Sequence, residues 1–138
     1  MHNINYYNHD ESEHPIDGEI KSWLDKCVDE MGLEVEQINY IFCTDEELLA
    51  INKEYLNHDY YTDIITFDLS ENKDEPLLTD LFISLDRVND NAQTNNIPNT
   101  LELKRVMIHG ILHICGYSDK TPEDTAVMRE KENYYIYL

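Results

Sequence analysis

The chain has few basic residues, no paired cysteines and no long apolar run, and each shortage excludes a class of protein. No stretch of about 18 apolar residues occurs in its 138 residues, so we expect no membrane-spanning segment. The amino-terminal segment MHNINYYNHDESEH lacks a basic region followed by an apolar run. We therefore expect no signal peptide and a cytoplasmic location. The three cysteines form no C-x-x-C pair, and an odd count argues against a disulfide framework.

Positive charge is scarce relative to negative charge. Ten lysines and arginines stand against 29 aspartates and glutamates, which gives a formal net charge of −19. Such a surface favours solubility and repels polyanions. Because nucleic-acid binding normally requires a basic surface that neutralises phosphates, the charge argues against strong nucleic-acid binding by the isolated chain.

The length fits one domain, residues 1–138, and no repeat or low-complexity linker divides it. Apolar periodicity and capping signals predict strands and helices that are mixed without strict alternation. The predicted strands are Ile4–Tyr7, Val35–Cys43, Thr62–Leu69 and Leu81–Leu85. The predicted helices are Pro15–Met31, a helix capped by Thr44, 86–95, a helix capped by Thr100 with the body Leu103–Cys115, and a helix capped by Thr121. This pattern favours an α+β fold with a mixed sheet of about four strands packed by four or five helices.

The segment Leu103–Cys115 is apolar on nearly all sides, which predicts a buried central helix. His109 and His113 lie one turn apart on it, so their Cβ atoms are about 6 Å apart on one face. This spacing allows both imidazoles to bind one ion at roughly 2.0–2.1 Å. Gly116 permits a left-handed turn after the helix, which would bring the carboxylate of Asp119 back toward that face. We predict a metal site made of these three side chains.

Two histidines and one carboxylate leave a coordination position open, which is typical of a catalytic metal site. The donor types favour zinc, and they also suit Fe(II), Mn or Ni. The alternative is that the two histidines are hydrogen-bonded core residues. Metalloproteases of the H-E-x-x-H type have a glutamate base where this chain has Gly110, which argues against a peptidase. Proton transfer would then fall to metal-bound water or to a group elsewhere, and Gly110 would instead let another part of the backbone approach the helix.

Three segments resemble the YbeY family of single-strand endoribonucleases and rRNA maturation factors. The string HGILHICGYSD is similar to the family's H-G-x-L-H-L-x-G-Y-D-H, with nine of eleven positions equal or close. INKEYLNHDYYTDIITFD resembles L-N-x-x-Y-R-x-x-D-x-P-T-D-V-L-S-F-P, and TDLFISLDRV is similar to the family's G-D-I-x-I-S segment. The resemblance covers about residues 35 to 135 and keeps the order and spacing of the three blocks.

The resemblance implies a four-stranded mixed sheet with surrounding helices, one zinc ion and hydrolysis of RNA phosphodiesters. It also implies His109, His113 and Asp119 as the zinc ligands, where Asp119 replaces the family's usual third histidine. The added negative charge of an aspartate should make the ion a somewhat weaker Lewis acid. Asp63 and Thr66 are retained or close to the family pattern and are candidate supporting residues of the catalytic cleft.

Other positions depart from the family pattern or have a second interpretation. Leu56 replaces an arginine that is suited to binding a phosphate or a developing charge. Tyr61 and Asp68 replace the two prolines of the same block. The family's aspartates are retained at Asp59 and Asp63, where an equally good interpretation is that they cap turns.

Three functions remain as hypotheses. The first is a metal-dependent endoribonuclease that acts on single-stranded rRNA in ribosomal RNA maturation and ribosome quality control. In this case a basic ribosomal or ribosome-assembly protein would help to deliver the RNA to an acidic chain. The second is a metal-dependent hydrolase of another substrate, such as a peptide or a small molecule. The third is a non-catalytic ribosome-assembly module with a structural metal ion.

Overall fold

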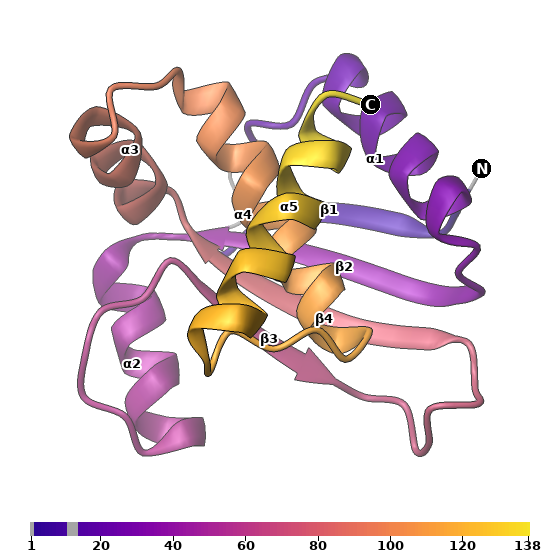
Figure 1. The fold of residues 1–138 in the computed structure, drawn as a ribbon. Coiled ribbons are helices and arrows are strands. Elements are labelled where there is room, and N and C mark those ends of the chain that lie inside the picture. Colours follow the sequence, from indigo (N-terminus) through magenta and orange to yellow (C-terminus); the bar gives the residue numbers. More distant parts are fainter. Residues whose placement is uncertain (1, 11–13) are drawn as a thin grey trace.

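The computed structural model describes residues 2–10 and 14–138, and these form four strands and five helices (Figure 1). In chain order the elements are β1 (Ile4–Asn8), α1 (Gly18–Met31), β2 (Val35–Cys43), α2 (Asp45–Leu56), β3 (Ile64–Asp68), β4 (Leu77–Ser84), α3 (Leu85–Thr94), α4 (Asn99–Ile114) and α5 (Pro122–Ile136).

The strands form one mixed sheet in the order β1-β2-β4-β3. The pairs β1–β2 and β2–β4 are parallel, and β3 runs antiparallel to β4 at the edge of the sheet. The predicted α+β class is therefore confirmed, with four strands and five helices within the described residues.

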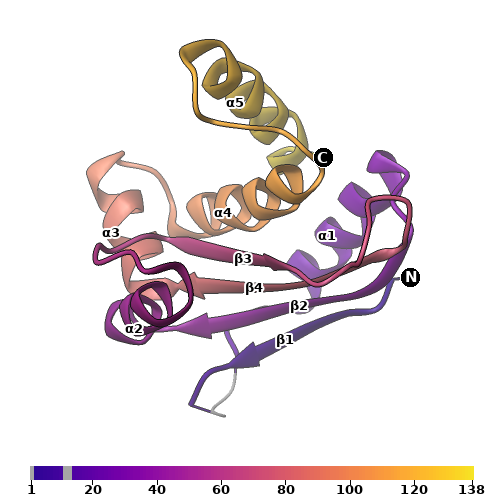
Figure 2. The ribbon, with the colours of Figure 1, turned by 90° about the horizontal axis from the view of Figure 1, so that it is seen from below.

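Alternate residues of the strands face two different apolar clusters. Ile38, Tyr40 and Leu81 point to the main core beneath α1 and α4, where all three are fully buried. Ile65 and Phe67 of β3 point to a smaller cluster with Leu48 of α2 on the opposite face. Figure 2 shows α4 lying against the sheet and α5 lying on the far side of α4. Eight of the 16 residues of α4 are buried, and His109 and His113 are not among them, so the helix is not buried on nearly all sides as the sequence predicted.

Local capping explains where most helices begin. Thr44 and Glu47 form the predicted capping box at α2, and Thr121 caps α5 with Pro122 in its first turn. The prediction for α4 was wrong, because its N-cap is Pro98 rather than Thr100, and no side chain caps it. The carbonyl of Pro98 accepts hydrogen bonds from the amides of Leu101 and Glu102, so the helix begins before Thr100.

No helix in the described part of the chain combines the length and apolar character that crossing a membrane requires.

Gly110 sets how closely α4 lies on the sheet. A methyl group added at this position would be 2.4 Å from Cδ2 of Leu81 and 2.7 Å from Cδ1 of Ile64. Leu81 is fully buried, so its side chain has little room to move away. Gly110 thus permits a close approach between α4 and the sheet. The sequence predicted that backbone would approach the glycine, whereas the nearest atoms belong to side chains.

We expect Gly110→Ala to lower the free energy of unfolding by about 1–2 kcal/mol. Overpacking of a core typically costs about 1–3 kcal/mol, and alanine returns up to about 1 kcal/mol of helix propensity. Denaturant unfolding of the variant measures the difference. Gly18→Ala is the matched control, because a methyl group there meets nothing within 4 Å. Equal stability of the two variants would contradict the packing argument.

Candidate functional site

The three predicted metal ligands line one open cleft, which we call the first cleft. His109 and His113 reach it from α4, and Asp119 reaches it from the loop that follows. The cleft has a volume of about 560 Å³. Its opposite wall comes from the end of α2 and from β3 with the loop before it, and it includes Leu56, Asp63 and Thr66 among other residues. The three predicted ligands and the supporting residues Asp63 and Thr66 therefore all lie at this cleft.

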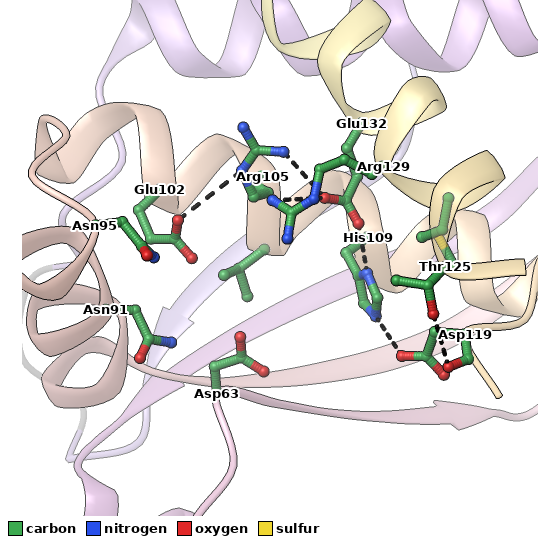
Figure 3. Close-up of a pocket in the computed structure, with 12 residues that line it drawn as sticks. Asp63, Asn91, Asn95, Glu102, Arg105, His109, Asp119, Thr125, Arg129 and Glu132 are labelled. Atoms are coloured by element: carbon green, nitrogen blue, oxygen red, sulfur yellow. Dashed lines mark hydrogen bonds and ion pairs between the residues drawn. The ribbon is translucent and has the colours of Figure 1, made fainter. Parts of the chain in front are cut away.

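His109 is the most firmly held of the predicted ligands. Its Nδ1 lies 2.7 Å from Oε2 of Glu132 on α5. Its Nε2 lies 3.7 Å from Oδ2 of Asp119 (Figure 3). The side chain is 27% exposed, so the ring stands at the boundary between the core and the cleft. One nitrogen of the ring is thus engaged by the protein interior, and the other faces the predicted third ligand.

The turn after α4 brings Asp119 back to His109. Gly116 has a φ of 106°, in the region that favours glycine, and its amide donates to the carbonyl of His113 at 3.1 Å. The hydroxyl of Thr125 donates to the carbonyl of Asp119 at 3.1 Å and ties the loop to α5. The predicted glycine turn is therefore confirmed. His113 and Asp119 both remain exposed to solvent.

The three side chains are near one another without forming a tight cluster. Within residues 2–10 and 14–138, no group of three or more His, Cys, Asp or Glu side chains is close enough to hold a metal ion as placed. The assignment of His109, His113 and Asp119 as ligands therefore stays a prediction, supported by their common cleft and by the short distance between His109 and Asp119.

Asp63 lies where the first cleft meets a second one, because it lines both. Burial raises the pKa of its carboxyl above the usual range, while the nearby His109 opposes this shift. Thr66 follows on the same strand, and its Cγ2 lies 3.4 Å from where a Cβ of Gly110 would be. By contrast, Asp59 is exposed and forms an ion pair with Lys53 at 3.3 Å, outside both clefts.

The second cleft, of about 380 Å³, is drawn in Figure 3 and contains a network of charged side chains. Glu132 is at its centre. Oε1 of Glu132 lies 3.1 Å from Nη1 of Arg105 and 3.8 Å from Nη1 of Arg129, and Oε2 lies against His109. Arg105 also approaches Glu102, with 3.9 Å between Nε and Oε1. The two clefts share His109, Asp119 and Asp63, so these residues stand between them.

The contact between His109 and Glu132 shifts the pKa of both groups. The hydrogen bond to Glu132 raises the pKa of His109 against the effect of burial, and the charges of Asp63 and Asp119 add to the rise. Burial acts to raise the pKa of Glu132, but the hydrogen bonds from His109 and Arg105 outweigh it and lower this pKa. The lowered pKa favours an ionised Glu132, and the raised pKa of His109 favours the protonated ring beside it.

Sequence reasoning missed Glu132, although a signal for it exists. Glu132 stands four residues after Met128 and four before Ile136, and all three are buried. Residues at this spacing share one face of a helix. An acidic residue on the buried face of α5 needs a partner there, which marks it as a candidate for the site.

Comparisons with known proteins agree with one another. Residues 3–137 match the family model described as Endoribonuclease YbeY. Endoribonuclease YbeY of Cytophaga hutchinsonii is 50% identical over 120 residues, which are 87% of this chain and 83% of that protein. Endoribonuclease YbeY of Flavobacterium johnsoniae is 46% identical over an alignment of 138 positions, which covers 99% of this chain and 95% of the relative. The solution structure of TM1509 from Thermotoga maritima aligns with a TM-score of 0.66 at 26% identity, covering 99% of this chain and 87% of the other.

Proposed function

Since the chain belongs to the YbeY endoribonuclease family, we propose that residues 1–138 form a single hydrolase domain that cleaves single-stranded ribosomal RNA with the help of a metal ion. The observation that carries this proposal is the common cleft of His109, His113 and Asp119. In a chain of this family, two imidazoles and a carboxylate at one open cleft form a donor set that suits a catalytic metal ion.

The residues present fit a zinc ion in their chemistry. Nε2 of His109 faces Asp119, and His113 lies one helical turn further along the same cleft. A bound zinc ion would polarise a phosphodiester oxygen and lower the pKa of a coordinated water. Fe(II), Mn and Ni also accept this donor set, and zinc is our first choice because it combines readily with histidine and carboxylate ligands.

Other residues of the first cleft would move protons and orient the substrate. The raised pKa of Asp63 brings its carboxyl closer to the range in which it exchanges a proton near neutral pH. Asp63 therefore serves as the candidate general acid or base, since it lines the same cleft as the three ligands. Thr66 contributes a hydroxyl group to the same wall.

The acidic surface would repel RNA from the cleft of the isolated protein. Among the described residues that line the first cleft, Lys120 is the only lysine or arginine. Arg105 and Arg129 line the second cleft and already face Glu132. With a net charge of −19, the protein would receive its RNA in a ribosomal context, where a basic ribosomal or ribosome-assembly protein offsets the repulsion. We therefore propose that it acts in cytoplasmic rRNA maturation and ribosome quality control.

We expect Leu56→Arg to increase cleavage of single-stranded RNA. Leu56 lines the first cleft and is 40% exposed, so an arginine there has access to a bound phosphate. A hydrogen bond to a charged group contributes about 1.5 kcal/mol, which corresponds to a roughly tenfold lower KM. Steady-state kinetics at several salt concentrations measures this, since one added phosphate contact steepens the salt dependence.

Tyr55→Arg is the control for this gain. Tyr55 adjoins Leu56 and is 64% exposed, but it lies outside the residues that line the first cleft. Tyr55→Arg adds the same charge to the surface without placing it in the cleft. An equal gain in both variants would show that net charge alone, and not a contact at position 56, controls RNA binding.

The function is tested by offering the purified, zinc-loaded protein three substrates in parallel. These are a single-stranded rRNA fragment, the same fragment annealed to its complement, and a mixture of unstructured peptides. The proposal predicts cleavage of the free strand alone. Cleavage of peptides but not of RNA would establish the alternative hydrolase, and equal cleavage of free and annealed RNA would contradict the single-strand preference.

A further inference from the structure

We propose that Glu132 is a positioning residue, which orients His109 so that Nδ1 carries the ring proton and Nε2 presents its lone pair to the first cleft. The inference rests on the proposed function, because it assigns His109 as a metal ligand. It adds a residue from α5, which contributes none of the three ligands. The orientation itself is a property of the protein without metal and can be tested in that state.

The contact between the two residues has a defined chemistry. Oε2 of Glu132 lies 2.7 Å from Nδ1 of His109. An ionised carboxylate only accepts hydrogen bonds, so Nδ1 of the imidazole must be the donor. In the neutral ring the lone pair then resides on Nε2, which is the nitrogen that faces Asp119 at 3.7 Å. Metal-binding histidines commonly donate their second N–H to a carboxylate in this way, and the partner fixes the ring and its tautomer.

Glu132 is itself held in place. Its side chain is only 5% exposed. Its Oε1 accepts a hydrogen bond from Nη1 of Arg105 at 3.1 Å, and the same nitrogen donates to Oδ1 of Asn133 at 3.1 Å. One carboxylate oxygen of Glu132 thus contacts Arg105, and the other contacts His109 (Figure 3). A carboxylate fixed by a buried ion pair gives the imidazole one preferred orientation rather than several.

The packing of α5 on α4 explains why these side chains meet. Glu132 lies between Met128 and Ile136 on the buried face of α5, and Arg105 and His109 lie one turn apart on α4. Glu132 therefore faces two successive turns of α4 and contacts one side chain from each, Arg105 and His109. An ion pair that served only to join the helices would be complete with Arg105 and Glu132. The additional short contact to His109 directs one carboxylate oxygen to the predicted site.

Glu132→Gln tests the proposal because it keeps the shape of the side chain and removes its charge. An amide presents a donor as well as an acceptor, so it no longer dictates which ring nitrogen carries the proton. Glu102→Gln is the matched control. The side chain of Glu102 is likewise buried, at 7% exposed, and it faces the same Arg105. The structure shows no hydrogen bond or ion pair between Glu102 and His109.

Two measurements on these proteins separate positioning from mere stability. In the metal-free state above the titration of His109, nitrogen NMR reports which ring nitrogen is protonated. We expect Nδ1–H in the wild type and in Glu102→Gln, and loss of this preference in Glu132→Gln. Zinc affinity, measured by competition with a chromophoric chelator, should fall roughly 10- to 100-fold in Glu132→Gln and remain within about threefold of the wild type in Glu102→Gln.

The spectrum of the wild type tests the proposal even when a variant fails to fold. If the main tautomer of His109 in the wild type carries its proton on Nε2, the proposal is overturned. Unchanged tautomer and zinc affinity in folded Glu132→Gln also overturn it, and leave RNA cleavage as an activity that stands without it. A third outcome is that Glu132→Gln shows the expected loss of the Nδ1–H preference, and yet the protein neither binds zinc nor cleaves RNA. This result would support the positioning of His109 by Glu132. The same result refutes the proposed function, so the two failures are distinguishable.

Discussion

Removal of the metal ion with a chelator is expected to reduce RNA cleavage to background and to leave the chain folded. The proposed ligands stand at an open cleft, with His113 and Asp119 exposed to solvent. The main core borders this cleft along α4, and its side chains, such as Tyr40, Leu24 and Ile111, are fully buried by packing against one another. Loss of the ion should therefore abolish RNA cleavage while the apolar core keeps the chain folded. Cleavage of a labelled single-stranded RNA and circular dichroism are measured on the same sample.

Re-addition of zinc is the control, and it should restore cleavage. Manganese, iron(II) and nickel are tested in the same way, because the ligand set accepts them. A chain that unfolds on chelation would show instead that the metal is structural, as in small metal-dependent domains. Full cleavage by a protein verified to be metal-free would refute metal-assisted hydrolysis.

His113→Ala is expected to lower kcat/KM for single-stranded RNA by more than about 100-fold. Replacing a residue that merely supports a metal ligand typically costs about 10- to 100-fold, and loss of a ligand should exceed this range. The side chain is exposed, so its removal leaves no cavity in the core and the thermal midpoint should change little. Cleavage kinetics and thermal unfolding are measured with zinc in excess.

His9→Ala is the matched control for this substitution. His9 lies outside both clefts and contacts Glu47 near the start of α2. The same histidine-to-alanine change there should leave kcat/KM within about twofold of the wild type. Comparable activity of His113→Ala and His9→Ala would remove His113 from the site.

Local signals in the sequence predicted those parts of the fold that depend on neighbouring residues. The capping box of Thr44 and Glu47 requires only residues three apart, and it is found as predicted. The strand that was predicted to begin at Leu81 begins at Leu77, because Leu77 pairs with Val35 on β2. That pairing joins residues far apart in the chain, and no local pattern at Leu77 indicates it.

The same distinction applies to the site. His109, His113 and Asp119 lie within 11 residues of one another and were found from their spacing and from the resemblance to a family. Glu132 reaches His109 from another helix, 23 residues further along. Its position on the buried face of α5 marks it as unusual, but only the crossing of α5 over α4 shows which residue it faces.

The most direct test of the central claim, that His109, His113 and Asp119 hold one metal ion, is elemental analysis of the purified protein and its variants. We predict one zinc ion per chain in the wild type. In the double variant His109→Ala/His113→Ala, with its fold verified by circular dichroism, we predict no bound ion. Asp119→Ala should retain less than the full amount after dialysis. One ion per chain in the double variant would contradict the account, because the metal would then be held by other residues.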